Sequence, residues 1–296
     1  MSKVTRRLSI TTLATLALIA GAQAATITYG GQAAMDGSGL TSAFVPASNI
    51  VNPATGYFIE TFDPDTKMLG QGVIATLPDG ITTSPVGDAT HNIALRAGDP
   101  CSINTYNIVT ITTTGGGFGV QTGGTGGVAA NPAGDSTCFG YGPRPGGGTP
   151  ATVKVNYATI LDPGVSISYL GLYYGSIDDY NNIAFYNGDT LLTGAGILSD
   201  GIVTGAEIRA ANGGPGNAGS WTAANSNVYI NLFFDPSETF TAFEFRTTGV
   251  AFELDNVVVG LTNRIDVPEP GSMLLVALGL IGAATLSRRR KGIKSA

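Results

Sequence analysis

A period-two pattern of apolar residues in the second half of the chain constrains its fold more than any other feature. Val153, Val155 and Tyr157 alternate with the polar residues Lys154 and Asn156, and this alternation is typical of a strand with one buried face. Between residues 25 and 266 no convincing amphipathic helix is found, and only residues 205–211 suit a short one. The pattern predicts an all-β fold, with further strands over 165–174, 182–186, 228–234, 239–246 and 250–259.

The first half of the chain is less regular. Strands are expected over residues 26–29, 56–62 and 72–77. The 43 Gly and 15 Pro among 296 residues make up about 20 % of the chain, below the ~25–30 % typical of low-complexity disorder. We therefore expect a mainly antiparallel β-sandwich over residues 25–266, with an irregular Gly- and Pro-rich segment at 115–150. A body of this length fits one large domain or two small ones.

Residues 1–24 have the anatomy of a secretory signal peptide. Basic residues at positions 3, 6 and 7 precede the apolar stretch 8–20, and Ala22-Gln23-Ala24 forms an A-x-A cleavage site. We expect signal peptidase to cleave after Ala24 or one residue to either side. The alternative, a retained N-terminal anchor, is weaker because small residues occupy the positions that a peptidase requires.

The last thirty residues, 267–296, divide into three parts. A Val267-Pro268-Glu269-Pro270-Gly271 stretch comes first, then an uncharged apolar run, then a basic cluster with Arg288, Arg289 and Arg290. The run predicts a short transmembrane helix over 272–287; at about 1.5 Å per residue it crosses a ~30 Å hydrocarbon core only thinly. The basic cluster favours the cytoplasmic side. An ordinary C-terminal anchor is the alternative explanation.

This order of parts resembles the PEP-CTERM sorting signal of Gram-negative bacteria. Pro268-Glu269-Pro270 matches the Pro-Glu-Pro core, the apolar run matches the short helix, and Arg288–Arg290 match the basic stop. The resemblance implies recognition by an exosortase, a membrane protease-transpeptidase. It further implies an inner-membrane-anchored precursor with its body in the periplasm, cleavage near 268–271, and transfer to the surface or the outside.

A second resemblance concerns residues 170–188, LGLYYGSIDDYNNIAFYNG. This stretch looks like the central motif of one group of exosortase-dependent surface proteins. Residues 251–257, AFELDNV, are similar to the closing strand of PEP-CTERM ectodomains, many of which are jelly-roll-like. The resemblance implies a jelly-roll-like sandwich and no particular enzymatic activity.

The charge of the body limits its partners. Residues 25–266 hold seven of the 15 basic residues and 20 of the 21 acidic ones, which gives a net charge of about −13. Such a surface repels nucleic acid phosphates and anionic lipid. Nucleic acid binding is therefore not expected.

The two cysteines, Cys101 and Cys138, suggest one disulfide in an exported chain. The bond would close a Gly-rich loop and contribute on the order of 4 kcal/mol in the chain-entropy model. Two reactive thiols are the alternative.

Several kinds of catalytic site are missing from the sequence. The chain has one histidine, His91, so a multi-histidine zinc or iron site cannot be built within it. It has no Gly-x-Ser-x-Gly elbow. Carboxylate chemistry remains, because glycoside hydrolysis needs only two acids at a defined separation. The glutamates available for it are Glu60, Glu207, Glu238, Glu244 and Glu253.

We expect no cofactor. A calcium ion is the one exception left open, because Asp63 and Asp65 in an Asp-Pro-Asp turn are oxygen ligands of the right kind. Two carboxylates alone do not identify such a site, and the metal is left unassigned.

Binding or a structural role fits the sequence better than catalysis. A sandwich rich in Gly, Asn and Asp with exposed aromatic residues can hold sugars by stacking and by hydrogen bonds. The expected ligand-binding residues are Tyr174, Asp178, Asp179, Tyr180 and Trp221, with Tyr173 as a further aromatic candidate. The leading hypothesis is a non-enzymatic surface or extracellular-matrix protein whose partner is polysaccharide or other matrix proteins. A dedicated carbohydrate-binding module and a carboxylate-dependent glycoside hydrolase are the alternatives.

Overall fold

The computed structural model describes residues 25–48, 56–63, 92–103, 109–159, 161, 164–194, 196 and 198–262. The expected strand at 72–77 lies outside these residues. So do the signal peptide at 1–24, the C-terminal segment at 267–296 with its expected helix at 272–287, and the side chains of Asp65 and His91.

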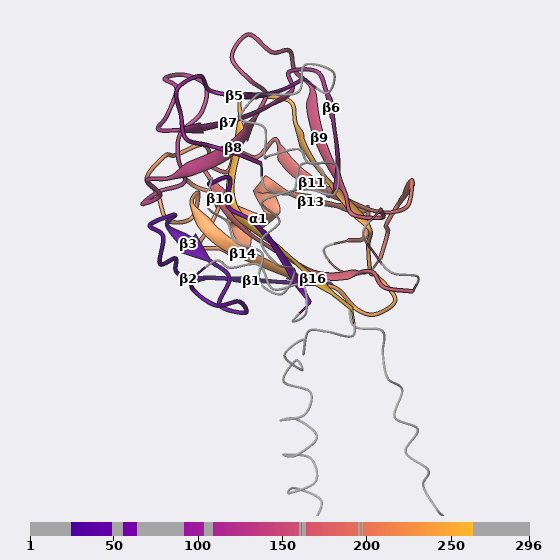
Figure 1. The fold of residues 1–296 in the computed structure, drawn as a ribbon. Coiled ribbons are helices and arrows are strands. Elements are labelled where there is room, and N and C mark those ends of the chain that lie inside the picture. Colours follow the sequence, from indigo (N-terminus) through magenta and orange to yellow (C-terminus); the bar gives the residue numbers. More distant parts are fainter. Residues whose placement is uncertain are drawn as a thin grey trace, which may run out of the picture.

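Most of the described strands form two sheets that face each other (Figure 1). The larger, eight-stranded sheet is antiparallel except where β5 pairs with β7. Strand β16 lies at its centre, because it pairs with β10 along one edge and with both β8 and β4 along the other. In sheet order its strands are β1 (Thr26–Tyr29), β14 (Val228–Phe233), β10 (Ile167–Gly175), β16 (Phe252–Leu261), β8 (Cys138–Gly142), β7 (Phe118–Thr122) and β5 (Ile93–Leu95), with β4 (Tyr57–Glu60) beside β16.

The smaller, six-stranded sheet is antiparallel throughout. Its strands in order are β12 (Thr190–Leu191), β11 (Asn181–Asn187), β15 (Ala242–Thr247), β9 (Ala151–Asn156) and β6 (Thr110–Thr114), with β13 (Ile202–Thr204) also paired to β11. A separate pair, β2 (Gln32–Ala33) and β3 (Leu40–Thr41), lies outside both sheets.

Aromatic side chains from both sheets fill the space between them. Tyr174 of β10 meets Phe245 of β15 edge-on at 6.3 Å between ring centroids, and Phe245 stacks on Phe252 of β16 at 5.2 Å. The period-two pattern of 153–157 follows from this packing, because Val153 faces the core and Lys154 the outside. The predicted all-β, mainly antiparallel fold is confirmed. The jelly-roll connection of the strands remains a prediction.

The two sheets differ in what covers their outer faces. All nine residues of β10 and all ten of β16 are buried, so the eight-stranded sheet is covered on both sides. In β6 and β9 buried and accessible residues alternate, so the six-stranded sheet is open on its outer side.

The segment 115–150 is more regular than expected. It contributes β7 and β8 to the large sheet, and all five residues of β8 are buried. Its glycines allow close packing rather than disorder: a Cβ on Gly140 would lie 2.4 Å from the Phe118 ring. The expectation of an irregular segment is therefore wrong for these two stretches.

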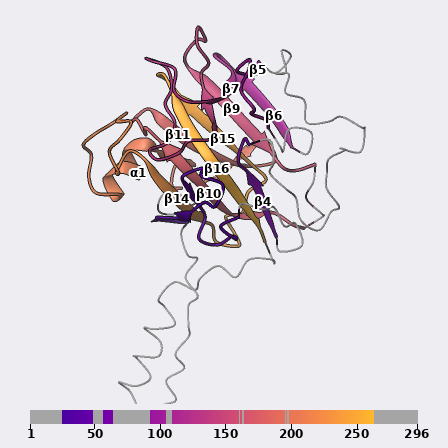
Figure 2. The same cartoon turned by 60° about the vertical axis from the view of Figure 1, so that its left-hand side comes forward.

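The short helix is confirmed as α1 (Gly205–Ala211). Thr204 and Glu207 form a capping box at its N-terminus, each side chain bonding the other residue's backbone N–H. Figure 2 shows α1 at one margin of the molecule, and the helix contacts β13 and β11 of the small sheet. In the described part of the chain no helix has the length and apolar character needed to cross a membrane.

The strands of the large sheet define two ends of the molecule. At the end that we call the base, β10 and β1 begin and β14 and β16 finish, as the pairs Ile167–Leu261 and Thr26–Phe233 show. At the end that we call the tip, β10 finishes at Gly175 while β14 and β16 begin. The first and last described residues, 25 and 262, therefore both lie at the base.

Candidate functional site

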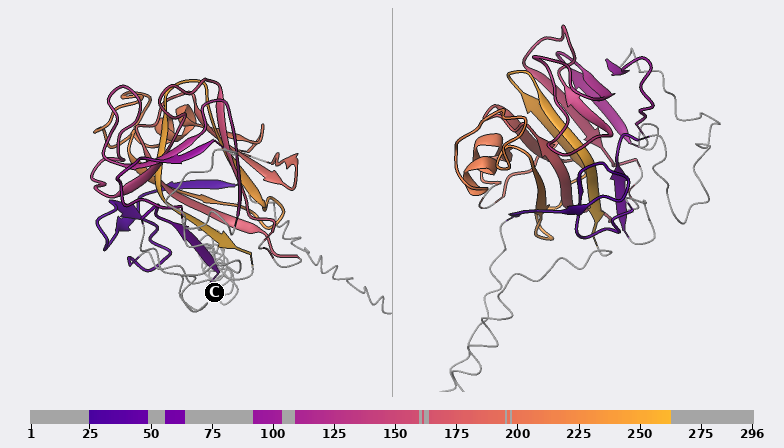
Figure 3. Two further views of the ribbon diagram at one scale, coloured as in Figure 1. Left: turned by 45° about the horizontal axis from the view of Figure 1, so that its top comes forward. Right: turned by 90° about the vertical axis from the view of Figure 1, so that its left-hand side faces the viewer.

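Three connections meet at the tip: residues 176–180 between β10 and β11, 212–227 between α1 and β14, and 248–251 between β15 and β16. Backbone hydrogen bonds join the first two. The Ile177 N–H donates to the Ser226 carbonyl at 2.8 Å, and the Gly219 N–H donates to the Ile177 carbonyl at 3.1 Å. The right-hand view of Figure 3 shows α1 and the chain that follows it at the margin of the molecule.

Tyr180 connects the first of these connections to the third. Its hydroxyl donates to the Val250 carbonyl at 3.2 Å. A Cβ on Gly249 would lie 2.5 Å from the Tyr180 ring, so only glycine allows this approach. Tyr180 is thereby held in place while its ring remains partly accessible.

Asp178 lies beside Tyr180, and each affects the other's pKa. Burial raises the pKa of the Asp178 carboxyl, and the hydrogen bond with Tyr180 and the charge of Arg209 oppose that rise. Burial also raises the pKa of the Tyr180 phenol, and the Asp178 carboxylate adds to this rise. At neutral pH Tyr180 is therefore a hydrogen-bonding phenol, not a phenolate.

Arg209 of α1 fixes the loop that follows the helix. Its side chain is 1 % exposed and forms an ion pair with Asp179. Its guanidinium also donates to the carbonyls of Pro215 at 2.5 Å and Gly216 at 2.8 Å. A charged group bonded to two carbonyls and a carboxylate holds the loop against the 176–180 connection.

Trp221 lies in this loop, two residues beyond Gly219, and is 48 % exposed. Val250, whose carbonyl accepts the Tyr180 bond, is 44 % exposed. The joined connections of the tip thus carry two accessible apolar side chains together with Tyr180 and two carboxylates. Of the expected ligand-binding residues, the structure gathers Asp178, Asp179, Tyr180 and Trp221 on these joined connections.

Tyr174 does not belong to this group. Its side chain is 0 % exposed and packs between the sheets against Phe245. Tyr173 is also buried, and its hydroxyl bonds the Ala133 carbonyl on the outer face of the large sheet. The expectation that Tyr174 contacts a ligand is corrected, because β10 is covered on both faces and leaves neither tyrosine accessible.

The five glutamates considered for catalysis do not converge. Glu244 lies on the open face of the small sheet, paired with Arg246 at 2.5 Å. Glu253 belongs to the other sheet, is 1 % exposed and bonds the Ser176 hydroxyl. The remaining three also have structural contacts: Glu60 accepts the Phe62 N–H, Glu207 caps α1, and Glu238 accepts the Ala25 N–H.

A further set of carboxylates lies on the covered face of the large sheet. Asp255 is wholly buried, and in the described part of the chain neither of its oxygens has a hydrogen-bond partner of normal geometry. Burial raises its pKa well above the usual range, and the nearby Asp135 adds to the rise. Burial likewise raises the pKa of Asp135 to about 6.

No metal site is found among the described residues: no three His, Cys, Asp or Glu side chains are placed to hold an ion together. Asp63, one of the two aspartates considered for calcium, instead accepts the Cys138 N–H at 3.1 Å. The other, Asp65, lies outside the described residues.

The open face of the small sheet carries a polar cluster that sequence patterns did not reveal. The Lys154 ammonium lies 4.1 Å from the centre of the Tyr186 ring, two strands away. Tyr186 also bonds Glu244 at 3.1 Å. In the pairing register Tyr186 lies opposite Ala242 and Lys154 lies opposite Glu244, so the Lys154 side chain reaches the Tyr186 ring diagonally across β15.

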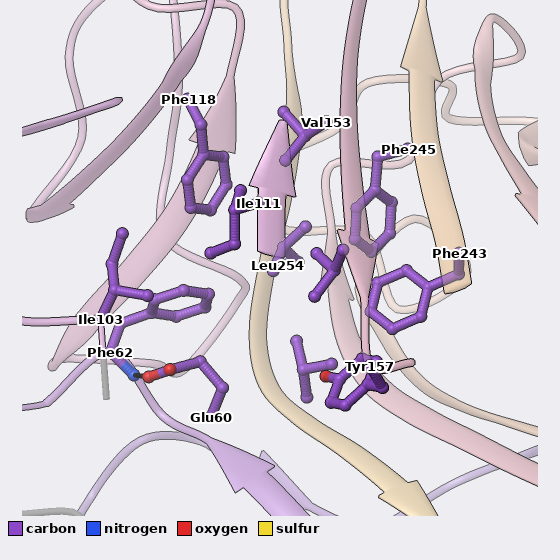
Figure 4. Close-up of a pocket in the computed structure, with 12 residues that line it drawn as sticks. Glu60, Phe62, Ile103, Ile111, Phe118, Val153, Tyr157, Phe243, Phe245 and Leu254 are labelled. Carbon is purple, nitrogen blue, oxygen red and sulfur yellow. Dashed lines mark hydrogen bonds between the residues drawn. The ribbon is translucent and has the colours of Figure 1, made fainter. Parts of the chain in front are cut away.

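Figure 4 shows a pocket between the sheets, with about 390 Å³ of space including the part open to solvent. Its lining is aromatic and aliphatic apart from the Glu60 carboxylate and the Tyr157 hydroxyl. The Phe62 N–H donates to Glu60 at 2.8 Å. The lining suits packing of the core and offers few polar groups to a sugar.

The expected disulfide is confirmed. Cys101 and Cys138 are bonded, with their Cα atoms 5.6 Å apart. The bond ties the segment that leads into β6 to the first residue of β8. No free cysteine is present.

Comparison with protein families identifies the C-terminal segment. Residues 266–291 match the PEP-CTERM protein-sorting motif. The chain carries a PEP-CTERM sorting signal. The matched range contains Val267–Gly271 and Arg288–Arg290, so the resemblance drawn from these residues is confirmed. Searches of curated proteins and of solved structures find no significant match to the chain.

The PEP-CTERM signal implies recognition by an exosortase. It also implies export and a membrane-anchored precursor that is processed to the cell surface. The signal covers 26 residues at the C-terminus.

Proposed function

We propose that this PEP-CTERM chain is a non-enzymatic protein of the cell surface or extracellular matrix, with a structural or adhesive role through polysaccharide. The sorting signal is the observation that carries the proposal. Signal peptidase and an exosortase act on the precursor, whose body passes through the periplasm, and the mature body then contacts polysaccharide or other matrix proteins outside the cell.

The geometry of the body supports a role for the tip in binding, because the tip lies at the end opposite the sorting signal. Residue 262, the last described residue before the sorting signal, lies at the base, and the tip lies at the other end of β10 and β16. Nine residues of β10 span about 30 Å. In a precursor anchored through its C-terminus, Trp221 and Tyr180 would face away from the anchor.

The chemistry of the tip supports a sugar ligand. An accessible indole offers a flat apolar surface for a sugar ring, and the Asp178 carboxylate and the lone pairs of the Tyr180 hydroxyl offer acceptors for hydroxyl groups. The same loop carries Asn217 and Asn225, whose side chains bond each other at 3.2 Å at an exposed position. Few charges and several amides suit a neutral, hydroxylated ligand.

The placement of the glutamates supports a non-enzymatic role. A glycosidase needs two carboxyl groups about 5–10 Å apart on either side of the scissile bond. Glu244 and Glu253 lie on different sheets, and Glu253 is buried. The test below would also detect hydrolysis.

Polysaccharide binding is tested with the exported protein in affinity gels that contain neutral or acidic polysaccharides. We expect retardation that Trp221→Ala weakens at least tenfold. Tyr186→Ala, on the open face of the small sheet, is the matched aromatic control and should leave the retardation unchanged. If Tyr186→Ala abolishes the retardation and Trp221→Ala does not, the polysaccharide-binding site lies on the open face of the small sheet instead.

Two results would contradict the proposal. Release of reducing sugar that a single Glu→Gln change abolishes would make the protein a hydrolase. Absence of binding to every polysaccharide tested would remove the adhesive role through polysaccharide. Mass spectrometry of the surface form tests the sorting step, since peptides that extend through residues 273–286 would show that the signal is not removed.

A further inference from the structure

The N-terminal edge of the body contains a carboxylate placed to receive a new chain terminus. The backbone nitrogen of Ala25 donates to Oε2 of Glu238 at 2.8 Å. Both residues are buried, Ala25 at 4 % and Glu238 at 7 % exposure. A side chain 213 positions away thus meets the first described residue of the chain at the base of the sandwich.

The surroundings of Glu238 form a defined site. The Glu238 N–H donates to the Asp235 carbonyl at 2.8 Å, which closes a turn after β14. A Cβ on Gly194 would lie 2.1 Å from Glu238 Oε1, so the carboxylate fits only against a glycine. Ala25 forms a parallel bridge with Gly196, and β1 pairs with β14 from Thr26 onward.

The sequence places a processing site at the same point. Ala22-Gln23-Ala24 has the small residues that signal peptidase requires, and the expected cut falls next to Ala25. In the uncut chain the nitrogen on Glu238 is a neutral amide. After a cut between Ala24 and Ala25 the same nitrogen is an α-ammonium group.

We propose that signal peptidase cleaves the Ala24–Ala25 bond and that the new α-ammonium group of Ala25 binds the Glu238 carboxylate as a buried ion pair. The step is a hydrolysis: water adds across the peptide bond, Ala24 keeps the carboxylate, and the Ala25 nitrogen takes up protons to become the ammonium. The inference does not depend on what the mature protein binds.

The pair links maturation to the stability of the fold. A charge-assisted hydrogen bond is roughly twice as strong as a neutral one. A buried ion pair stabilises a fold only where its groups are also well hydrogen-bonded, and the Ala25 nitrogen and Glu238 Oε2 already lie at 2.8 Å. The ion pair forms after only one cut, because an additional residue before Ala25 would move the charge away from Glu238 while leaving the amide in its place.

The test uses the full chain exported from its own signal peptide in a Gram-negative host. N-terminal sequencing of the mature protein should give Ala25 as the first residue. The variants are Glu238→Gln, which keeps the size and the acceptor oxygen but removes the charge, and an insertion of Gly between residues 24 and 25, made alone and together. Unfolding in urea is followed through Trp221, the single tryptophan of the chain.

Each change alone should lower the folding equilibrium constant at least tenfold, and the two together should lower it no further than one of them. Glu244→Gln serves as the control and should act additively with the Gly insertion. A mature terminus other than Ala25, or additive effects of Glu238→Gln and the insertion, would overturn the proposal.

Discussion

The guanidinium of Arg209 is buried at 1 % exposure while its partner, the Asp179 side chain, is 61 % exposed. The ion pair therefore joins the inside of the tip to its surface. Arg209 also bonds two carbonyls of the loop that carries Trp221, so the position of the exposed indole depends on a side chain that no ligand would touch.

Arg209→Met tests this dependence. Methionine keeps much of the apolar stem but leaves the Pro215 and Gly216 carbonyls without their donor, so we expect a loss of about 2 kcal/mol of stability. We also expect stronger acrylamide quenching of the Trp221 fluorescence, because the loop is released. Arg246→Met, on the open face of the small sheet, should leave the quenching unchanged; equal quenching in both variants would contradict the role assigned to Arg209.

Two Tyr→Phe variants compare a buried hydroxyl that lacks a hydrogen-bond partner among the described residues with one that has a partner. The Tyr174 hydroxyl has no hydrogen-bond partner among the described residues, so Tyr174→Phe should raise the free energy of unfolding by about 1 kcal/mol. Tyr169 donates to Asn231 at 2.7 Å, so Tyr169→Phe should lower it by about 1–2 kcal/mol. Urea denaturation measures both. A destabilised Tyr174→Phe would reveal a partner for that hydroxyl.

Because the pKa of Asp135 is raised, we expect its contribution to the stability of the protein to fall as the pH rises. Its folded pKa is raised to about 6 by burial, above the unfolded value near 3.9, so the folded state holds the proton more tightly. Its contribution is complete below about pH 4 and is lost as the pH rises through about 6, with a size on the order of 3 kcal/mol. Asp135→Asn should reduce the change in the urea midpoint between pH 4 and 6. The same substitution at the exposed Asp189 should leave that change as it is in the unmodified protein. An unchanged slope in Asp135→Asn would show that Asp135 is not the group responsible.

The disulfide should stabilise the body strongly. Cys101 and Cys138 are 37 positions apart, and a loop of this length predicts about 4 kcal/mol in the chain-entropy model. The double substitution to serine should lower the unfolding free energy by roughly that amount and leave the near-UV circular dichroism of the native state similar. A loss under about 1 kcal/mol would mean that the loop stays compact in the unfolded chain.

Sequence patterns located most of the longer strands and missed β6 (Thr110–Thr114). The stretches at 26–29, 182–186 and 228–234 correspond to β1, β11 and β14, and the short helix at 205–211 has the bounds of α1. Local alternation and turn residues carry this information, because one face of a half-covered strand meets solvent. The disulfide followed from the count of cysteines alone.

Two strands covered on both faces, β7 and β8, were missed, although three others, β10, β14 and β16, were predicted. In β7 and β8 buried and accessible residues do not alternate. Gly119 and Gly140 lie where aromatic rings leave no room for a Cβ, so the two strands have a glycine content that is more typical of a loop. The same double cover hides Tyr174, which looks like an accessible aromatic residue in the sequence. At the candidate site, the turn at 178–180 and Trp221 could be found from sequence, but the bonds of Arg209 depend on contacts made only in the folded chain.

The positions of base and tip also determine how the body would carry a mechanical load. A matrix protein held through residue 262 and pulled at Tyr180 or Trp221 would be stretched along β10 and β16, which run from one end to the other. Ladder hydrogen bonds lie across the strand direction, so this force would shear the bonds of β16 to β10 and to β4 together rather than open them one after another. The arrangement resists extension in the direction in which a surface-bound polymer would apply it.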